Sequence, residues 1–180
     1  MSVLSTLPAG TYNIDPSHSR VGFSARHAMV TKVRGAFNEY TGAATVADGA
    51  ASLNIDITVA SIDTRSADRD GHLQSPDFFD VANFPKITFA STGVKDSGSD
   101  KIVVDGNLTI KDVTKPISIT FEYTGTATDP FGNARFGFEG EAEINRKDYG
   151  LTWNAALETG GILVSENIKL EFEISTIAAK

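Results

Sequence analysis

The chain has 180 residues, no cysteine and a formal net charge of −7. Its length and apolar content fit one globular domain, and the lack of cysteine excludes disulfides and thiolate metal sites. The acidic balance argues against nucleic acid as the main partner, because neutralising phosphates requires clustered Lys and Arg.

The first ten residues, MSVLSTLPAG, have neither a basic start nor a long apolar run. They therefore predict neither a signal peptide nor a transmembrane segment, and we expect a cytoplasmic location. We expect residues 1–180 to form one domain with its core between about residues 11 and 177. The oligomeric state is left open, a homodimer included.

Residues 16–38 contain no acidic residue but carry four cations, Arg20, Arg26, Lys32 and Arg34. In an acidic protein, such a segment can receive an anionic headgroup. The alternative is that these side chains pair with acids on neighbouring strands or face water.

Alternating apolar and polar residues predict strands along most of the chain. In ASLNIDITVA, Leu53, Ile55 and Ile57 alternate with polar residues, so one face is apolar and the other is wet. The same pattern recurs in 102–110, 117–123, 136–144 and 168–174, with Gly- and Asp-containing turns between the runs. We expect about eight antiparallel strands, hence an all-β fold.

So many amphipathic strands can form a sandwich or close into a barrel. Several runs reach ten residues or more, which favours the barrel. An eight-stranded antiparallel barrel has an interior that is either packed by side chains or able to hold one slender ligand.

The segment TRSADRDGHLQSPDFFD, residues 64–80, interrupts the alternation. Ser66 can cap a helix, Asp68 lies in its first turn and Pro76 ends it, which predicts a short helix over about 66–75. We expect this insert to cover one mouth of the barrel, the alternative being that it only plugs the core. Its acids are interpreted as solvated or capping residues rather than as a catalytic pair.

Chemistry-bearing residues are sparse. His18, His27 and His72 have spacing unsuited to a common metal, and His27 is expected to point into the core beside Phe23. The DPSHS segment contains the residue types of a triad, but neighbours in one turn do not converge as a nucleophile, base and orienter. We therefore predict no catalytic residue, no metal and no cofactor.

Four segments, taken in order, resemble the YceI-like family of bacterial lipid-binding proteins. They are YNIDPSHSRVGFSARHAMVTKVRGAF, SIDTRSADRDGHLQSPDFFDVANFPKITF, GNLTIKDVTKPISI and RFGFEGEAEINRKDYGLTW. The resemblance implies an extended lipocalin-like barrel that holds a polyisoprenoid, an isoprenoid quinone or a fatty-acyl lipid in its lumen. It implies no catalytic residue.

The two lines of reasoning lead to one expected site. The lumen is expected to bury the lipid tail, which gains free energy without polar contacts, and polar residues at the mouth orient the headgroup. Trp153, beside Arg146, either braces a barrel corner or lines the mouth. The predicted mouth residues are Arg26 and Asp70, and the predicted lumen residues are Phe23, His27, Phe37, Ile55, Ile57, Phe89, Leu108, Phe121, Phe136, Phe138 and Trp153.

Two other functions remain as alternatives. One is an enzyme acting on a hydrophobic metabolite through His27 or an acid of the insert. The other is a structural or stress-related barrel whose core is completely filled.

Overall fold

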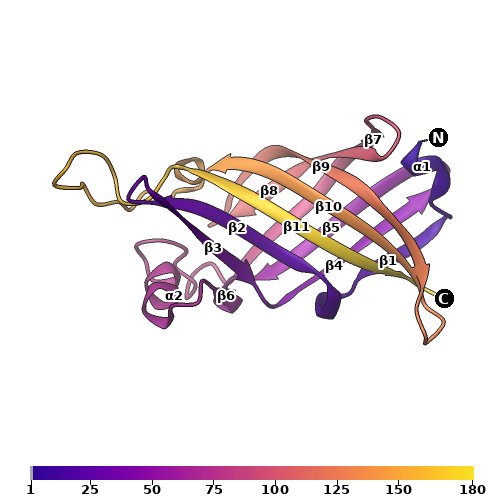
Figure 1. Cartoon of the computed structure of the whole chain (residues 1–180), viewed down its shortest axis with the longest axis horizontal. Coiled ribbons are helices and arrows are strands. Elements are labelled where there is room, and N and C mark those ends of the chain that lie inside the picture. Colours follow the sequence, from indigo (N-terminus) through magenta and orange to yellow (C-terminus); the bar gives the residue numbers. More distant parts are fainter. Residues whose placement is uncertain (1) are drawn as a thin grey trace.

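The computed structural model describes residues 2–180, and its strands form one antiparallel sheet that curls into an elongated barrel (Figure 1). The barrel is closed because β1 pairs with both β4 and β11. In spatial order its eight strands are β1 (Gly10–Ile14), β4 (Tyr40–Ala47), β5 (Ala50–Thr58), β7 (Lys86–Asp96), β8 (Lys101–Ile110), β9 (Val113–Thr128), β10 (Ala134–Asn145) and β11 (Asn167–Ala178). The predicted all-β, eight-stranded antiparallel barrel is confirmed, and the sandwich alternative is wrong.

Three further strands extend this sheet on one side: β2 (Arg20–His27), β3 (Thr31–Phe37) and β6 (Ile62–Asp63). The edge of β11 is used twice, because residues 176–178 pair with β1 while residues 169–173 pair with β2. Strands β3 and β6 then continue outward from β2.

The predicted helical insert is confirmed as α2 (Ala67–Gln74). The Ser66 hydroxyl accepts a hydrogen bond from the backbone N–H of Arg69 at 3.4 Å, and the helix ends at Ser75, directly before Pro76. Helix α2 lies at one end of the barrel, together with the β2–β3 turn and the loop that precedes β11 (Figure 1). We call this the α2 end.

The opposite end, here the α1 end, carries both termini and the short helix α1 (Val3–Thr6) (Figure 1). Val3 and Leu4 are buried, and the backbone N–H of Leu4 donates to Asp96 Oδ1 at 3.1 Å. The N-terminal segment therefore contributes two residues to the hydrophobic core. Among residues 2–180, no helix combines the length and hydropathy needed to cross a bilayer.

Single 3₁₀ turns bend the chain where strands change direction: η1 (Pro16–His18), η2 (Val59–Ser61) and η3 (Arg146–Tyr149). Two-residue hairpin turns connect other strands, with both turn residues at positive φ. Asp48 and Gly49 join β4 to β5, and Lys111 and Asp112 join β8 to β9. Asp and Gly are common in such turns because they tolerate the left-handed conformation.

Candidate functional site: the barrel lumen and its mouth

The α2 end contains a mouth cavity of about 200 Å³, formed by β2, β3, α2 and the 151–166 loop. Aliphatic and aromatic side chains make up most of its wall. Its polar and charged members are Arg26, His27, Thr64, Arg69 and His72. The cavity thus combines an apolar surface with cations at its rim, an arrangement suited to an amphiphile.

Arg26 lies at the mouth as predicted, and Trp153 lines the cavity. His27 also lines it, but its side chain is exposed, so the expectation of a core histidine is wrong. By alternation along β2, the His27 side chain lies on the same inward face as Phe23. It is exposed because β2 extends beyond the packed core at this end.

Asp70 does not line the mouth cavity. Its carboxylate accepts hydrogen bonds from both the backbone N–H and the hydroxyl of Thr64. Arg69 in turn donates to the Thr64 hydroxyl at 2.8 Å and to the Thr64 carbonyl at 2.6 Å. Asp70 therefore supports the wall of the mouth, and Arg69 is the cation that sequence reasoning missed.

Three aromatic rings form one side of the mouth. The ring of His72 meets Trp153 edge-to-face with centroids 4.7 Å apart, and Phe78 lies 5.4 Å from Trp153. His72 Nε2 also lies 2.8 Å from an Asp77 carboxylate oxygen. These rings come from α2, the segment after it and the 151–166 loop, so they join the insert to the barrel.

An inner cavity of about 130 Å³ lies deeper in the same end. It shares Phe23, Ala25, Leu73, Phe78 and Val164 with the mouth cavity, which makes the two spaces neighbours. The predicted lumen residues Phe37 and Leu108 line it. Helix α2 itself has no buried residue, while Phe78, later in the insert, is buried in the core. The insert therefore both lines these cavities and adds to the core.

Arg146 is only 3% exposed and stands in this apolar wall. Its guanidinium donates to four carbonyls of the loop, those of Leu151, Trp153, Val164 and Ser165, at 2.6 to 3.3 Å. Burial lowers the pKa of Arg146. Both interpretations of this corner therefore apply, since Arg146 braces the loop and Trp153 lines the mouth.

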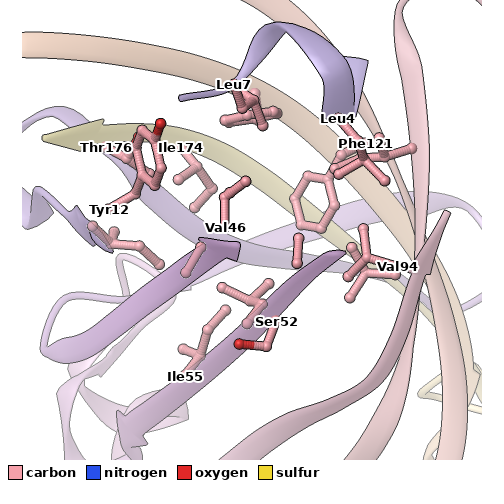
Figure 2. A pocket seen from close by; sticks show the side chains of 17 residues that line it. Leu4, Leu7, Tyr12, Val46, Ser52, Ile55, Val94, Phe121, Ile174 and Thr176 are labelled. Carbon is pink, nitrogen blue, oxygen red and sulfur yellow. The ribbon is translucent and has the colours of Figure 1, made fainter. Parts of the chain in front are cut away.

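A third cavity, of about 70 Å³, lies at the α1 end (Figure 2). Leu4 and Leu7 cover it from the N-terminal segment. Tyr12, Ser52 and Thr176 carry the hydroxyl groups of its lining, and the other lining side chains are apolar. Three predicted lumen residues line this cavity: Ile55, Phe121 and Phe138.

The remaining predicted lumen residues line none of these three cavities. Ile57 and Phe89 are buried, and the Phe89 ring lies over Gly106, where an added Cβ would come within 2.4 Å of it. Phe136 packs edge-to-face on Tyr12 with centroids 5.1 Å apart. The lumen is therefore two chambers separated by a packed middle, not one open tunnel.

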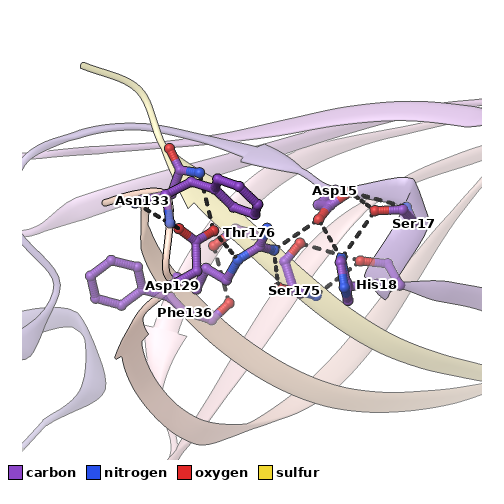
Figure 3. Close-up of polar contacts among 11 residues, drawn as sticks. Asp15, Ser17, His18, Asp129, Asn133, Phe136, Ser175 and Thr176 are labelled. Atoms are coloured by element: carbon purple, nitrogen blue, oxygen red, sulfur yellow. Dashed lines mark hydrogen bonds and ion pairs between the residues drawn. The ribbon is translucent and has the colours of Figure 1, made fainter.

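A polar cluster on the barrel surface near the α1 end explains the DPSHS segment (Figure 3). Arg135 bridges the carboxylates of Asp15 and Asp129, each at 2.8 Å. The Ser17 hydroxyl and Arg135 hold the pKa of Asp15 well below its usual value. His18 Nδ1 faces both Ser17 and Asp15, whereas a catalytic histidine contacts its nucleophile and its orienting acid through different ring nitrogens.

The structure defines a class of protein: a closed antiparallel barrel with apolar internal chambers and a mouth lined by cations and aromatic rings. The YceI-like domain model matches residues 12–176, so the chain belongs to the YceI-like family. Protein YceI of Salmonella newport (strain SL254) is 39% identical over 149 residues, which cover 80% of this chain and 78% of that protein.

Solved structures agree with this assignment. The Campylobacter jejuni YCEI protein has a TM-score of 0.74 and 27% identity, covering 86% of this chain and 90% of that one. A polyisoprenoid binding domain from Saccharophagus degradans, implicated in plant cell wall breakdown, has a TM-score of 0.72 and 15% identity, covering 96% of this chain and 100% of that one. The latter likeness concerns the fold alone.

Proposed function

We propose that this protein binds the apolar tail of a polyisoprenoid, an isoprenoid quinone or a related fatty-acyl lipid, with the tail inserted from the α2 end. The observation that carries the proposal is the pair of adjoining cavities behind the mouth, whose walls are apolar while Arg26 and Arg69 lie at the rim. The name of the Saccharophagus degradans neighbour points to the same class of ligand.

The cavity volumes indicate how much tail the α2 end accommodates. A cavity of about 150 Å³ lined by aliphatic and aromatic side chains takes up one benzene molecule. The two α2-end cavities, of about 130 and 200 Å³, therefore have room for about two groups of five or six carbons. A longer tail would reach the α1-end chamber only if the side chains between the two chambers move.

Burial of the apolar tail supplies enough free energy for binding, so no covalent bond to the lipid is needed. At about 0.8 kcal/mol for each methylene-sized group, one five-carbon isoprene unit contributes ~4 kcal/mol. Binding and carriage are thus proposed in preference to turnover. The filled-core alternative is disfavoured by the apolar cavities, since a completely packed barrel would have no such spaces.

The test is to offer purified protein a polyprenol, an isoprenoid quinone and a long-chain fatty acid in separate incubations. Native mass spectrometry after removal of free lipid should show a one-to-one adduct with at least one of them. Uptake of none of these lipids from detergent or ethanol solution would overturn the proposal. Time-dependent conversion of a bound lipid would favour the enzyme alternative.

A further inference from the structure

The most exposed apolar side chains at the α2 end lie at the β2–β3 turn. Met29 is 64% exposed and Val30 is 74% exposed. The turn is closed by a hydrogen bond from the Val30 N–H to the His27 carbonyl at 3.0 Å. Burial in a chamber does not explain these two side chains, because neither lines any of the three lumen cavities.

The turn has an unfavourable sequence for its shape. Ala28 and Met29 both have positive φ, at 50° and 63°. The connection has three residues, 28–30, whereas the two-residue turns with paired positive φ use Asp48 with Gly49 and Lys111 with Asp112. Asn-Gly or Asp-Gly would adopt two consecutive positive φ angles with less strain. The Met29 side chain lies over Gly161 of the neighbouring loop, where an added Cβ would come within 2.4 Å of its sulfur, and it is still largely exposed.

The turn is fixed next to the mouth. The Ala28 N–H donates to the Leu163 carbonyl at 2.8 Å, and the Ser165 N–H donates to the Arg26 carbonyl at 3.1 Å. The 155–163 segment that it meets carries Leu157, Ile162 and Leu163, and Leu163 lines the mouth cavity. The exposed apolar tip is thus continuous with the wall of the site through the 151–166 loop (Figure 1).

Cations flank the tip. Arg26, Lys32 and Arg34 are exposed, and within residues 2–180 none of their side chains forms a salt bridge. Residues 16–38 contain no acid, and Glu158 is the single acid of residues 151–165. In a chain of net charge −7, the turn and its two flanking strands thus carry cations and no acid.

We propose that the β2–β3 turn and the 155–163 segment form a docking surface for an anionic lipid bilayer. Met29 and Val30 insert among the acyl chains, while Arg26, Lys32 and Arg34 contact anionic headgroups. This arrangement combines a shallow apolar insertion with electrostatic attraction, the two contributions that hold peripheral proteins on membranes. The inference rests on the proposed function for its purpose, because docking places the mouth where a lipid tail enters directly from the bilayer.

The experiment measures two properties of each variant: sedimentation with phosphatidylcholine vesicles, with or without phosphatidylglycerol, and uptake of a polyprenol from detergent solution. The test variants are Met29→Glu with Val30→Glu, and Lys32→Gln with Arg34→Gln. The control is Phe131→Glu, because Phe131 is 83% exposed in the β9–β10 turn at the opposite end of the barrel (Figure 1). Circular dichroism verifies that each variant folds.

The parent should bind vesicles containing phosphatidylglycerol more tightly than neutral ones, and added salt should weaken that binding. The glutamate pair at Met29 and Val30 should lower vesicle affinity about tenfold or more. The glutamine pair should lower it about fivefold for each cation removed. Phe131→Glu should leave vesicle affinity unchanged, and every variant should still take up polyprenol from detergent.

The docking surface would be overturned if the parent does not bind vesicles, or if Phe131→Glu loses as much vesicle affinity as the test variants. It would also be overturned if the tip instead mediates self-association, seen as a lower oligomer mass for Met29→Glu with Val30→Glu than for the parent. The two proposals fail separately. Parent protein that takes up polyprenol from detergent but ignores vesicles refutes docking alone. Protein that binds vesicles through the tip but takes up no lipid refutes the proposed function.

Discussion

Replacing Ala25 by Phe should close the site without unfolding the barrel. Ala25 lies on β2 and lines both α2-end cavities. The added phenyl group has six carbons and would occupy the space of about one isoprene unit. At about 0.8 kcal/mol per methylene-sized group, the five carbons displaced would cost the lipid ~4 kcal/mol. This corresponds to roughly a thousandfold rise in Kd.

The same ring should have little effect on folding, because it enters space that already exists. We expect the free energy of unfolding of the ligand-free protein to change by less than about 1.5 kcal/mol. The control is Thr45→Phe, which places the same ring on the exposed face of β4 and should leave lipid affinity unchanged.

Fluorescence titration with a polyprenol measures the affinity, and urea denaturation measures the stability. A variant at Ala25 that binds within about threefold of the parent would refute insertion from the α2 end. A loss of stability of about 3 kcal/mol or more in the ligand-free variant would show that the cavities do not offer the space described.

Three further predictions concern the scaffold. Arg146→Met should lower the free energy of unfolding by at least about 3 kcal/mol in urea denaturation, because four loop carbonyls lose their donor; an unchanged midpoint would contradict the bracing role. Arg135→Met should raise the depressed pKa values of Asp15 and Asp129. The difference in free energy of unfolding between parent and variant should therefore be largest at neutral pH and decrease as the pH falls below about 4. A difference that stays constant down to about pH 2 would refute this linkage. Ser66→Ala should destabilise α2 locally by about 1 kcal/mol, seen as faster hydrogen exchange in α2 with unchanged exchange in β9; equal exchange in α2 would show that the cap contributes nothing.

The strands and the helical insert could be predicted because their signals are local. Alternation with a period of two places Ile55 on the inner face of β5 whatever its neighbours are. In the same way, Ser66 and Pro76 mark the ends of α2 on their own. The alternation therefore assigned the correct face of β5, and the capping residues gave the ends of α2.

The details of the site depend on packing between distant residues, which no local pattern carries. The Phe89 ring, for example, packs over Gly106 on the neighbouring strand. The cover of the α1-end cavity includes Leu4 of α1, a helix of four residues that is too short to show periodicity. Alternation correctly placed His27 on the inner face of β2, but it could not show that β2 extends beyond the packed core and leaves this side chain exposed.

The double use of the β11 edge divides the closure of the barrel between two partner strands. Only three residue pairs join β1 to β11, five pairs join β2 to it, and residues 15–19 interrupt the edge between them. The Asp15 N–H nevertheless donates to the Ser175 carbonyl and the Ser175 N–H donates to the Ser19 hydroxyl, each at 2.9 Å. Closure of the barrel therefore depends on two short stretches of strand pairing and on the hydrogen bonds at Ser175 between them.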